Sequence, residues 1–188
     1  MSEEAALFSS TVPRQLKHRR RVFCEGYARE DGRWDVDARL LDTRGYALTV
    51  FFNQLLPVGE PLHQMGLRMT VDGLLVVCEV QALTLHGPAP ECRAIAPVYQ
   101  QLVGLRIGPG FSARVRDLFK GTAGCTHLTE LLGVMATVAF QTVLPPGGPE
   151  GSASKDDPPP TGLIDSCHAF RSDGEVVLRR WPQHRKPG

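Results

Sequence analysis

The strongest constraint on the fold is a hairpin signal in the first half of the chain. Asp72 and Gly73 stand between two apolar runs, and an Asp-Gly dipeptide in that setting is typical of a tight β-hairpin turn. The run before the turn alternates, with Met65 and Leu67 on one face and polar side chains on the other. A short turn joins antiparallel strands, so the sequence predicts a hairpin over about residues 63–85.

Two more segments extend this pattern towards the N-terminus. Residues 34–40 follow an Asp31-Gly32 turn and alternate between apolar and polar side chains, which indicates a half-buried strand. Residues 47–56 form a further apolar run rich in Val and Phe. We therefore expect the first half to fold as an antiparallel meander.

The second half has a different period. Its apolar residues recur at spacings of three and four, which is typical of helices. A strand-like patch follows an Asp-Gly turn near the C-terminus. Helices are predicted over about residues 92–102, 111–120 and 125–143, and a strand over 175–178. The predicted fold class is α+β, with an antiparallel β-meander first, helices after it and a short returning β-segment at the C-terminus.

The length of 188 residues predicts one domain. Residues 1–15 are mostly polar and form a flexible lead-in to a single α+β domain over residues 16–182. Within that domain, residues 145–162 consist largely of Pro, Gly, Ser and Asp, a composition that predicts a mobile loop. Residues 183–188 form a tail.

Charge and composition exclude several classes of function. The chain has 21 Lys and Arg against 20 Asp and Glu, and this balance gives no electrostatic case for a nucleic-acid partner. No apolar run approaches the roughly 18 residues of a membrane span, and the N-terminus lacks the apolar core of a secretory signal. Five cysteines without an export signal predict reduced thiols in the cytoplasm. The oligomeric state is left open.

Three cysteines stand beside chemically active neighbours. Cys92 lies at a turn into a predicted helix, Cys125 lies at the start of the longest helix with His127 close behind, and Cys167 precedes His168. Thiolates with imidazole suit zinc and, less well here, iron or an iron–sulfur cluster. The sequence predicts a metal site in which Cys92, Cys125 and Cys167 converge with His127 or His168.

The position of Cys125 also has a functional interpretation that requires no metal. A helix N-terminus favours a thiolate, so Cys125 with a nearby histidine is a candidate nucleophile. We expect Cys125 at the cap, before regular helix geometry begins, because the preceding residues 121–124 are a poor helix start. That placement lets His127 reach the same pocket. The plain alternative is that the cysteines pack as small apolar side chains.

Polar side chains in the strand half supply the remaining site candidates. An exposed polar face of the sheet explains them in one interpretation; in the other, this face lines a pocket whose opposite wall carries Cys125 and His127. In the second interpretation the pocket holds a small anionic substrate. The strand-half candidates are His63 as a general base, Arg68 and Arg29 as anion clamps, and His18 and Tyr27 as further ligand-binding groups. Glu130, on the polar flank of the longest predicted helix with His127, is the alternative general base.

The longest motif is Gly-Cys-Thr-His-Leu-Thr-Glu-Leu-Leu at residues 124–132, and further matching stretches lie at 26–35, 61–72 and 167–168. On these residues the chain resembles a bacterial family of unassigned function, over about residues 16–182. The resemblance implies no established activity. It implies an association with genes for the breakdown of aromatic compounds or acyl thioesters.

Taken together, these features predict a small cytoplasmic enzyme that depends on zinc or iron. The expected reaction is hydrolysis or a lyase step on a small carboxylated or thioester substrate. The alternative is a non-catalytic protein that carries a metal or an iron–sulfur cluster. It rests on a looser similarity to iron–sulfur scaffold proteins, whose late pair is His-Cys where this chain has Cys167-His168.

Overall fold

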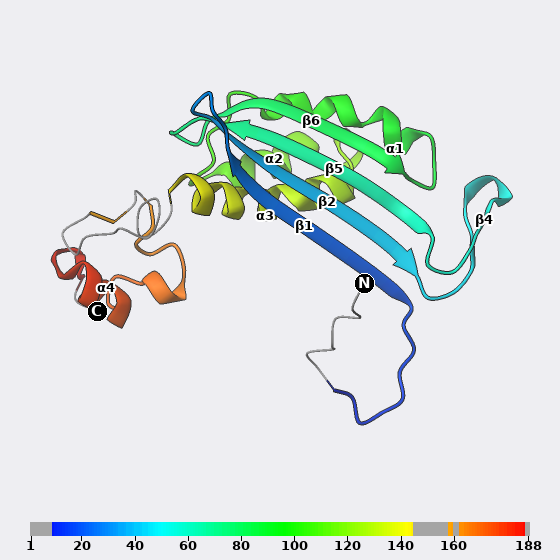
Figure 1. Cartoon of the computed structure of the whole chain (residues 1–188), viewed down its shortest axis with the longest axis horizontal. Coiled ribbons are helices and arrows are strands. Elements are labelled where there is room, and N and C mark those ends of the chain that lie inside the picture. The colour runs from blue at the N-terminus through cyan, green and yellow to red at the C-terminus, as the bar shows by residue number, and fades with distance from the viewer. Residues whose placement is uncertain (1–8, 145–157, 160–161, 187–188) are drawn as a thin grey trace.

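A four-stranded antiparallel sheet forms the centre of the protein. The computed structural model describes residues 9–144, 158–159 and 162–186. The strands follow the order β1–β2–β5–β6, which confirms the predicted meander (Figure 1). Their bounds are β1 His18–Ala28, β2 Trp34–Arg44, β5 Pro61–Val71 and β6 Val77–His86. The apolar run at 47–56 is interrupted: it forms a small hairpin of β3 Leu48–Thr49 and β4 Leu55–Leu56 around the 3-10 turn η1 Phe51–Asn53.

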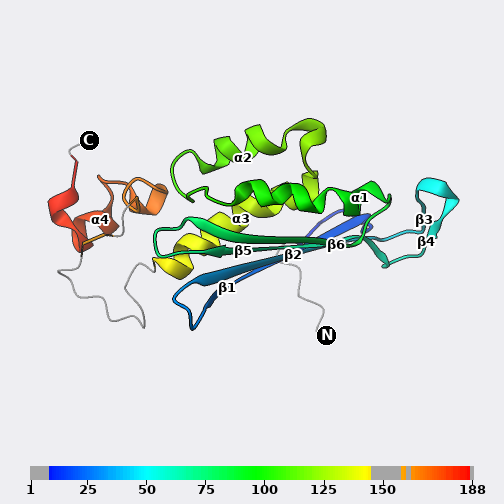
Figure 2. The same ribbon diagram turned by 90° about the horizontal axis from the view of Figure 1, so that it is seen from above.

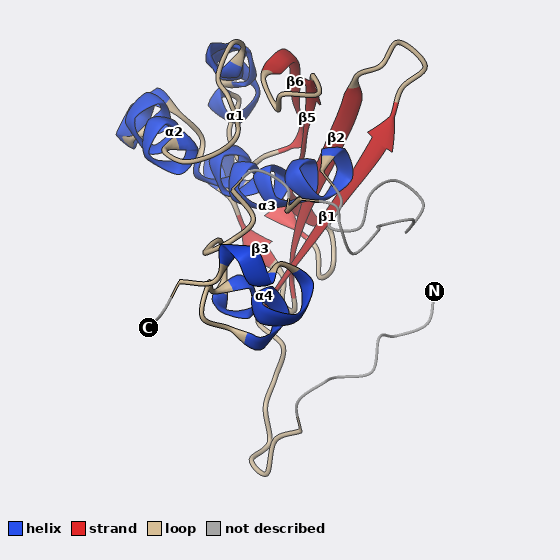
Figure 3. Cartoon of the chain, turned by 90° about the vertical axis from the view of Figure 1, so that its left-hand side faces the viewer, coloured by secondary structure: helices blue, strands red, loops and turns tan. Residues whose placement is uncertain are grey.

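The helices that follow cover one face of this sheet, as Figures 2 and 3 show. We call this face the inner face and the opposite one the outer face. The longest helix, α3, contacts β1, β2 and β5. The bounds are α1 Glu91–Ala94, η2 Ala96–Leu102, α2 Phe111–Phe119, η3 Gly121–Ala123 and α3 Thr126–Val143. The predicted α+β fold with strands first and helices after is therefore correct.

The core lies between the inner face and α3. Along β2, Val36, Ala38 and Leu40 are buried at alternate positions because successive strand residues point to opposite faces. The apolar stripe of α3 packs against them, and its members are Leu128, Leu131, Leu132, Met135 and Ala139. Burial of these side chains supplies the main stabilisation, at roughly 1.5–3 kcal/mol for each fully buried large apolar residue.

Gly26 permits β1 to approach α3 closely. A Cβ atom at this position would lie 2.0 Å from Oγ1 of Thr142. Real atoms do not come so close, so any larger residue here requires the Thr142 side chain or the helix that carries it to shift. The contact fixes the position of α3 relative to β1 and β2.

The returning β-segment predicted at the C-terminus is wrong. Residues Glu175–Arg180 form the helix α4, flanked by the 3-10 turns η5 His168–Phe170 and η6 Pro182–His184. Glu175 in the first turn and Arg179 in the last suit the helix dipole, and the two side chains form an ion pair at a spacing of four. Val177 and Trp181 are buried but do not belong to the main core cluster. This segment therefore has a small apolar centre of its own.

The predicted mobile loop at 145–162 lies almost entirely outside the described residues, as do residues 1–8 of the predicted lead-in and 187–188 of the tail. Residues 9–17 are exposed and form no helix or strand. Within the described part of the chain, none of the helices has the length and apolar character that a membrane span requires.

Candidate metal centre

Asp42 is the centre of the candidate site. It continues the inner-face series of β2 at the next alternate position after Leu40, where an apolar residue is expected. Its side chain is only 1% exposed. An ionised carboxylate at such a position is costly unless charged or hydrogen-bonding groups surround it. The identity of those groups therefore defines what the site is.

Arg20 satisfies most of this demand. The register of β1 and β2 places Arg20 directly opposite Asp42, and its Nε and Nη2 donate to the two carboxylate oxygens at 2.8 and 2.7 Å. Burial alone would raise the pKa of Asp42, but the hydrogen bonds and charge of Arg20, with help from His18, hold that pKa at about 2. Arg20 also donates to Glu130 on α3. The ion network thus joins two strands to the helix.

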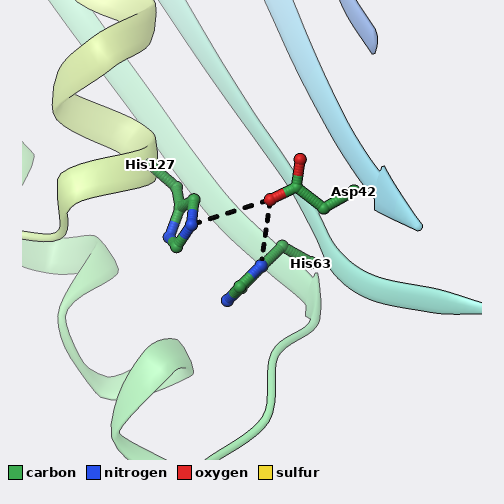
Figure 4. Close-up of side chains that lie close together, drawn as sticks. All are labelled: Asp42, His63 and His127. Atoms are coloured by element: carbon green, nitrogen blue, oxygen red, sulfur yellow. Dashed lines mark hydrogen bonds and ion pairs between the residues drawn. The ribbon is translucent and has the colours of Figure 1, made fainter. Parts of the chain in front are cut away.

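Two histidines meet at the same carboxylate. His63 is the partner of Asp42 in the β2–β5 register, and its Nδ1 lies 3.1 Å from Oδ2 of Asp42. His127, in the first turn of α3, places Nε2 at 3.7 Å from the same oxygen. The two imidazole rings lie against each other with centroids 3.8 Å apart. Figure 4 shows both rings turned towards Asp42.

The start of α3 determines where His127 points. Cys125 is the N-cap residue with extended backbone geometry, which confirms the predicted placement before the first helical turn. The backbone N–H of Cys125 donates to the hydroxyl of Tyr99, and that hydroxyl lies 2.9 Å from the Cys125 carbonyl oxygen. Tyr99 is fully buried. It therefore anchors the helix start and brings His127 over the end of β2.

Asp42, His63 and His127 have the arrangement of a metal-ligand set. One ligand atom from each residue lies within 4.8 Å of the other two, and no other group of three or more His, Cys, Asp or Glu in the described residues meets this condition. An ion at about 2.0–2.2 Å from imidazole nitrogen and carboxylate oxygen fits among atoms so spaced. Burial lowers the pKa of both histidines, aided by each imidazole's cationic neighbours. Neutral imidazole is the form that binds metals.

The structure does not assemble the predicted cysteine ligand set. Cys92 packs beside Gly87 at α1, and the Cys125 sulfur lies 4.0 Å from the sulfur of Met65. Cys167 is exposed. The C-terminal segment that carries it lies at one end of the sheet, whereas β2 ends at the opposite end (Figure 1). His168 lies in that same segment, 3.1 Å from Nη1 of Arg171. A histidine close to a cysteine in sequence does not determine how far apart the three cysteine-bearing segments lie in space. Of the five residues in the predicted ligand set, the Asp42–His63–His127 group contains only His127.

The predicted pocket wall is divided between the two faces of the sheet. His63 shares the inner face with Met65 and Leu67, whereas Arg68 lies on the outer face and pairs with Asp37. Because side chains alternate along a strand, residues 63 and 68 cannot share a face. Arg68 instead lines an open hollow of about 550 Å³ on the outer face.

The other predicted anion clamp is also occupied and also on the outer face. Arg29 forms ion pairs with Asp31 and Asp35. Tyr27 points outward, is half exposed and hydrogen-bonds to Glu25, an interaction that raises its pKa. These residues therefore lie on the opposite side of the sheet from the histidines.

Besides His63 and His127, two further predicted residues lie at the centre. His18 on β1 places Nε2 at 3.2 Å from Oδ1 of Asp42. Glu130, one turn after His127, pairs with Arg20 and has a side chain that is 51% exposed. His18 and Glu130 thus lie on either side of the Arg20–Asp42 pair.

Sequence reasoning missed Asp42 and the role of Arg20. A signal for Asp42 exists: it interrupts an apolar series at 36, 38 and 40 with a charged residue of the same parity. A carboxylate on a core-facing position needs a cationic partner or a ligand. Arg20 lies inside the basic run at residues 17–21 and has no distinguishing neighbour in the sequence.

The fold and the site define a class: an α+β protein with a candidate mononuclear metal centre at one end of its sheet. The comparison with protein families is more specific. The chain belongs to DUF2889, a family of proteins of unknown function, with a match over residues 18–141 that includes every residue of the centre. No curated protein and no solved structure matches the chain.

Proposed function

We propose that the protein is a small metal-dependent enzyme in which Asp42, His63 and His127 bind one zinc or iron ion. The proposed reaction is hydrolysis or a lyase step on a small carboxylated or thioester substrate. The observation that carries this proposal is the convergence of three ligand atoms within 4.8 Å from β2, β5 and α3. Two imidazoles with one carboxylate are a ligand set that zinc and ferrous iron both use in enzymes.

The number and type of ligands favour a catalytic site over a structural or carrier site. Structural zinc sites are usually closed by four protein ligands, whereas catalytic sites keep a position open. Three protein ligands leave such a position here. The group contains no thiolate, and iron–sulfur clusters are held mainly by cysteine thiolates. A metal-dependent enzyme is therefore better supported than a non-catalytic metal or iron–sulfur carrier.

The surrounding residues have separate roles in this proposal. A bound ion supplies Lewis-acid polarisation of a substrate oxygen or of water. Arg20 keeps Asp42 ionised and fixes its orientation through two hydrogen bonds. Glu130 is the proposed general base, because its carboxylate lies at the exposed rim beside the centre.

The five cysteines are free, which supports a reducing compartment such as the bacterial cytoplasm.

Metal analysis of the purified protein tests this proposal. We expect one equivalent of zinc or iron, and saturable binding of Zn²⁺ or Fe²⁺ to the metal-free protein. His63→Ala and His127→Ala should each weaken zinc binding by about 100-fold or more, since each removes a ligand. His86→Ala is the matched control, because it removes an imidazole that is not part of the metal-ligand group. His86 lies on the edge strand β6, and its Nδ1 is 2.9 Å from Oε1 of Gln64. Absence of saturable binding of either ion would refute the proposal.

One observation favours a second candidate function, that of a cysteine-nucleophile enzyme. The Cys125 sulfur lies 3.9 Å from Nδ1 of His127, whose Nε2 faces Asp42 at 3.7 Å. Nucleophile, imidazole and carboxylate therefore follow one another as in cysteine hydrolases. In the metal-dependent proposal the same contact orients the His127 ring instead.

The two candidates differ in how Cys125 and zinc affect each other. A nucleophile makes Cys125 the fastest cysteine to react with iodoacetamide, and His127→Ala should slow it while Cys24 is unaffected. In the metal-dependent proposal, Cys125→Ser retains zinc affinity within about tenfold, the range of an outer ligand contact. Protein that binds no metal but labels selectively at Cys125 would favour the nucleophile.

A further inference from the structure

Arg44, the last residue of β2, has a buried donor without an acceptor. It lies two residues after Asp42, so alternation along the strand places it on the inner face. Its Nε is buried, and no described residue accepts a hydrogen bond from it or pairs with its guanidinium. Buried polar groups in folded proteins are almost always hydrogen-bonded. The Nε of Arg44 therefore needs an acceptor, and the described residues do not supply one.

Arg44 differs in this respect from five other arginines on or beside the sheet, each of which pairs with a carboxylate. The guanidinium of each of those residues is already neutralised, including both arginines that the sequence suggested as anion clamps. The pairs are Arg20 with Asp42 and Glu130, Arg29 with Asp31 and Asp35, Arg33 with Glu79, Arg39 with Glu25, and Arg68 with Asp37.

The strand register connects Arg44 to the metal centre. Arg44 stands directly opposite His18 in the β1–β2 pairing, and cross-strand partners have Cβ atoms about 4.5–5.5 Å apart. His18 in turn reaches Asp42 with its Nε2. The register shift beside this position falls on β5, where Leu62 is the extra residue. The alternation of β2 is therefore unbroken from Asp42 to Arg44.

From this placement we propose that Arg44, with His18 beside it, binds the carboxylate of a small monoanionic substrate next to the metal centre. This inference rests on the proposed function. A guanidinium offers a planar pair of donors that matches a carboxylate. The charge of Arg20 is already offset by Asp42 and Glu130, whereas no carboxylate among the described residues pairs with Arg44. Arg44 therefore contributes a positive charge that these residues leave uncompensated at this end of the inner face. One positive charge suits a singly charged carboxylate better than a phosphate dianion.

Calorimetric titration with acetate, benzoate and inorganic phosphate tests the assignment, in metal-free and zinc-loaded protein. We expect one carboxylate site per chain, with benzoate or acetate bound more tightly than phosphate. Arg44→Met should weaken carboxylate binding by about tenfold or more, the scale of a lost charge-assisted hydrogen bond. Arg44→Lys should retain part of the affinity. The matched control is Arg39→Met, which removes a cation of the same strand from the outer face.

Zinc affinity separates this inference from the proposed function. If Arg44 binds substrate only, Arg44→Met keeps the wild-type zinc affinity within about threefold, a smaller change than loss of an outer contact to a ligand produces. Wild-type protein that binds zinc but no carboxylate, or that binds carboxylate equally well after Arg44→Met, would overturn the inference alone. Tighter binding of phosphate than of either carboxylate would overturn the choice of substrate class. Should Arg44→Met fail to fold, Arg44→Lys carries the comparison with Arg39→Met.

Discussion

Asp42→Asn should destabilise the metal-free protein by about 2 kcal/mol at pH 7. The pKa of Asp42 is about 2 in the folded protein against an ordinary value of 3.8. A shift of nearly two units corresponds to about 2 kcal/mol of preferential stabilisation of the carboxylate, at 1.36 kcal/mol for each unit. The side chain is 1% exposed, so solvent screening does not reduce this value. Asparagine keeps the shape and removes the charge.

The measurement is urea unfolding of wild type and variant in the presence of a chelator. With a slope of about 2 kcal/mol per molar urea, the midpoint should fall by about 1 M. Because the pKa is depressed in the folded state, the stabilisation is fully present above about pH 4. It is lost as the pH falls through 2. The difference between the two proteins should therefore be the same at pH 7 and pH 5, and should shrink from pH 4 towards pH 2.

Asp37→Asn is the matched control for this experiment. Asp37 lies on the outer face of the same strand and pairs with the half-exposed Arg68. Exposed ion pairs contribute about 0–1 kcal/mol, so the control should lose less than Asp42→Asn. A loss below about 0.5 kcal/mol for Asp42→Asn, or a difference that persists undiminished at pH 2, would refute the network that we describe.

Three further predictions follow from the packing and charge of the same region. Gly26→Ala should lower the free energy of unfolding by about 1–3 kcal/mol through its clash with Thr142, and Thr142→Ala in the same chain should recover part of that loss in urea unfolding. Tyr99→Phe should cost about 1–2 kcal/mol, because it leaves backbone groups at the start of α3 without the hydroxyl partner; thermal unfolding measures this loss, and an unchanged midpoint would contradict the anchor. Burial lowers the pKa of His63 and of His127 in the folded protein. As the pH falls below about 6.5, the unfolded chain therefore binds protons before the folded protein does, and the metal-free protein should lose stability. A double variant with alanine at both positions should show a flatter dependence of the free energy of unfolding on pH in urea unfolding.

Part of the centre could be derived from the sequence, and the limit is set by the length of the connections. The Asp31-Gly32 turn is tight, so it fixes the pairing of the strands on either side and with it the opposition of Arg20 and Asp42. The charged interruption of an apolar series at residue 42 was also readable. By contrast, the chain between β2 and β5 is long and contains its own small hairpin. No local rule determines that His63 faces Asp42.

The errors at the C-terminus and in the cysteine set have separate physical causes. Residues 175–178 are too short to distinguish a strand from one helical turn by alternation, and the ion pair of Glu175 with Arg179 belongs to the helical spacing. The cysteines were grouped because each stands at a turn or a helix start. That feature describes local backbone geometry and carries no information on distances between segments. Cys125, at the cap of α3, does lie beside a residue of the centre, with its sulfur 3.9 Å from Nδ1 of His127.

The candidate centre is also a tertiary link of the fold. Asp42, Arg20 and Glu130 join β2, the edge strand β1 and the helix α3 through successive ion pairs, near the end of the sheet opposite the Gly26–Thr142 contact. Edge strand and helix are therefore held at two points, one an ion-pair network and the other a close steric contact. Loss of stability in an Asp42 or Arg20 variant is consequently no evidence for a functional role. Removal of an imidazole leaves the Arg20–Asp42 pair intact, so metal affinity after His63→Ala or His127→Ala reports on the centre itself.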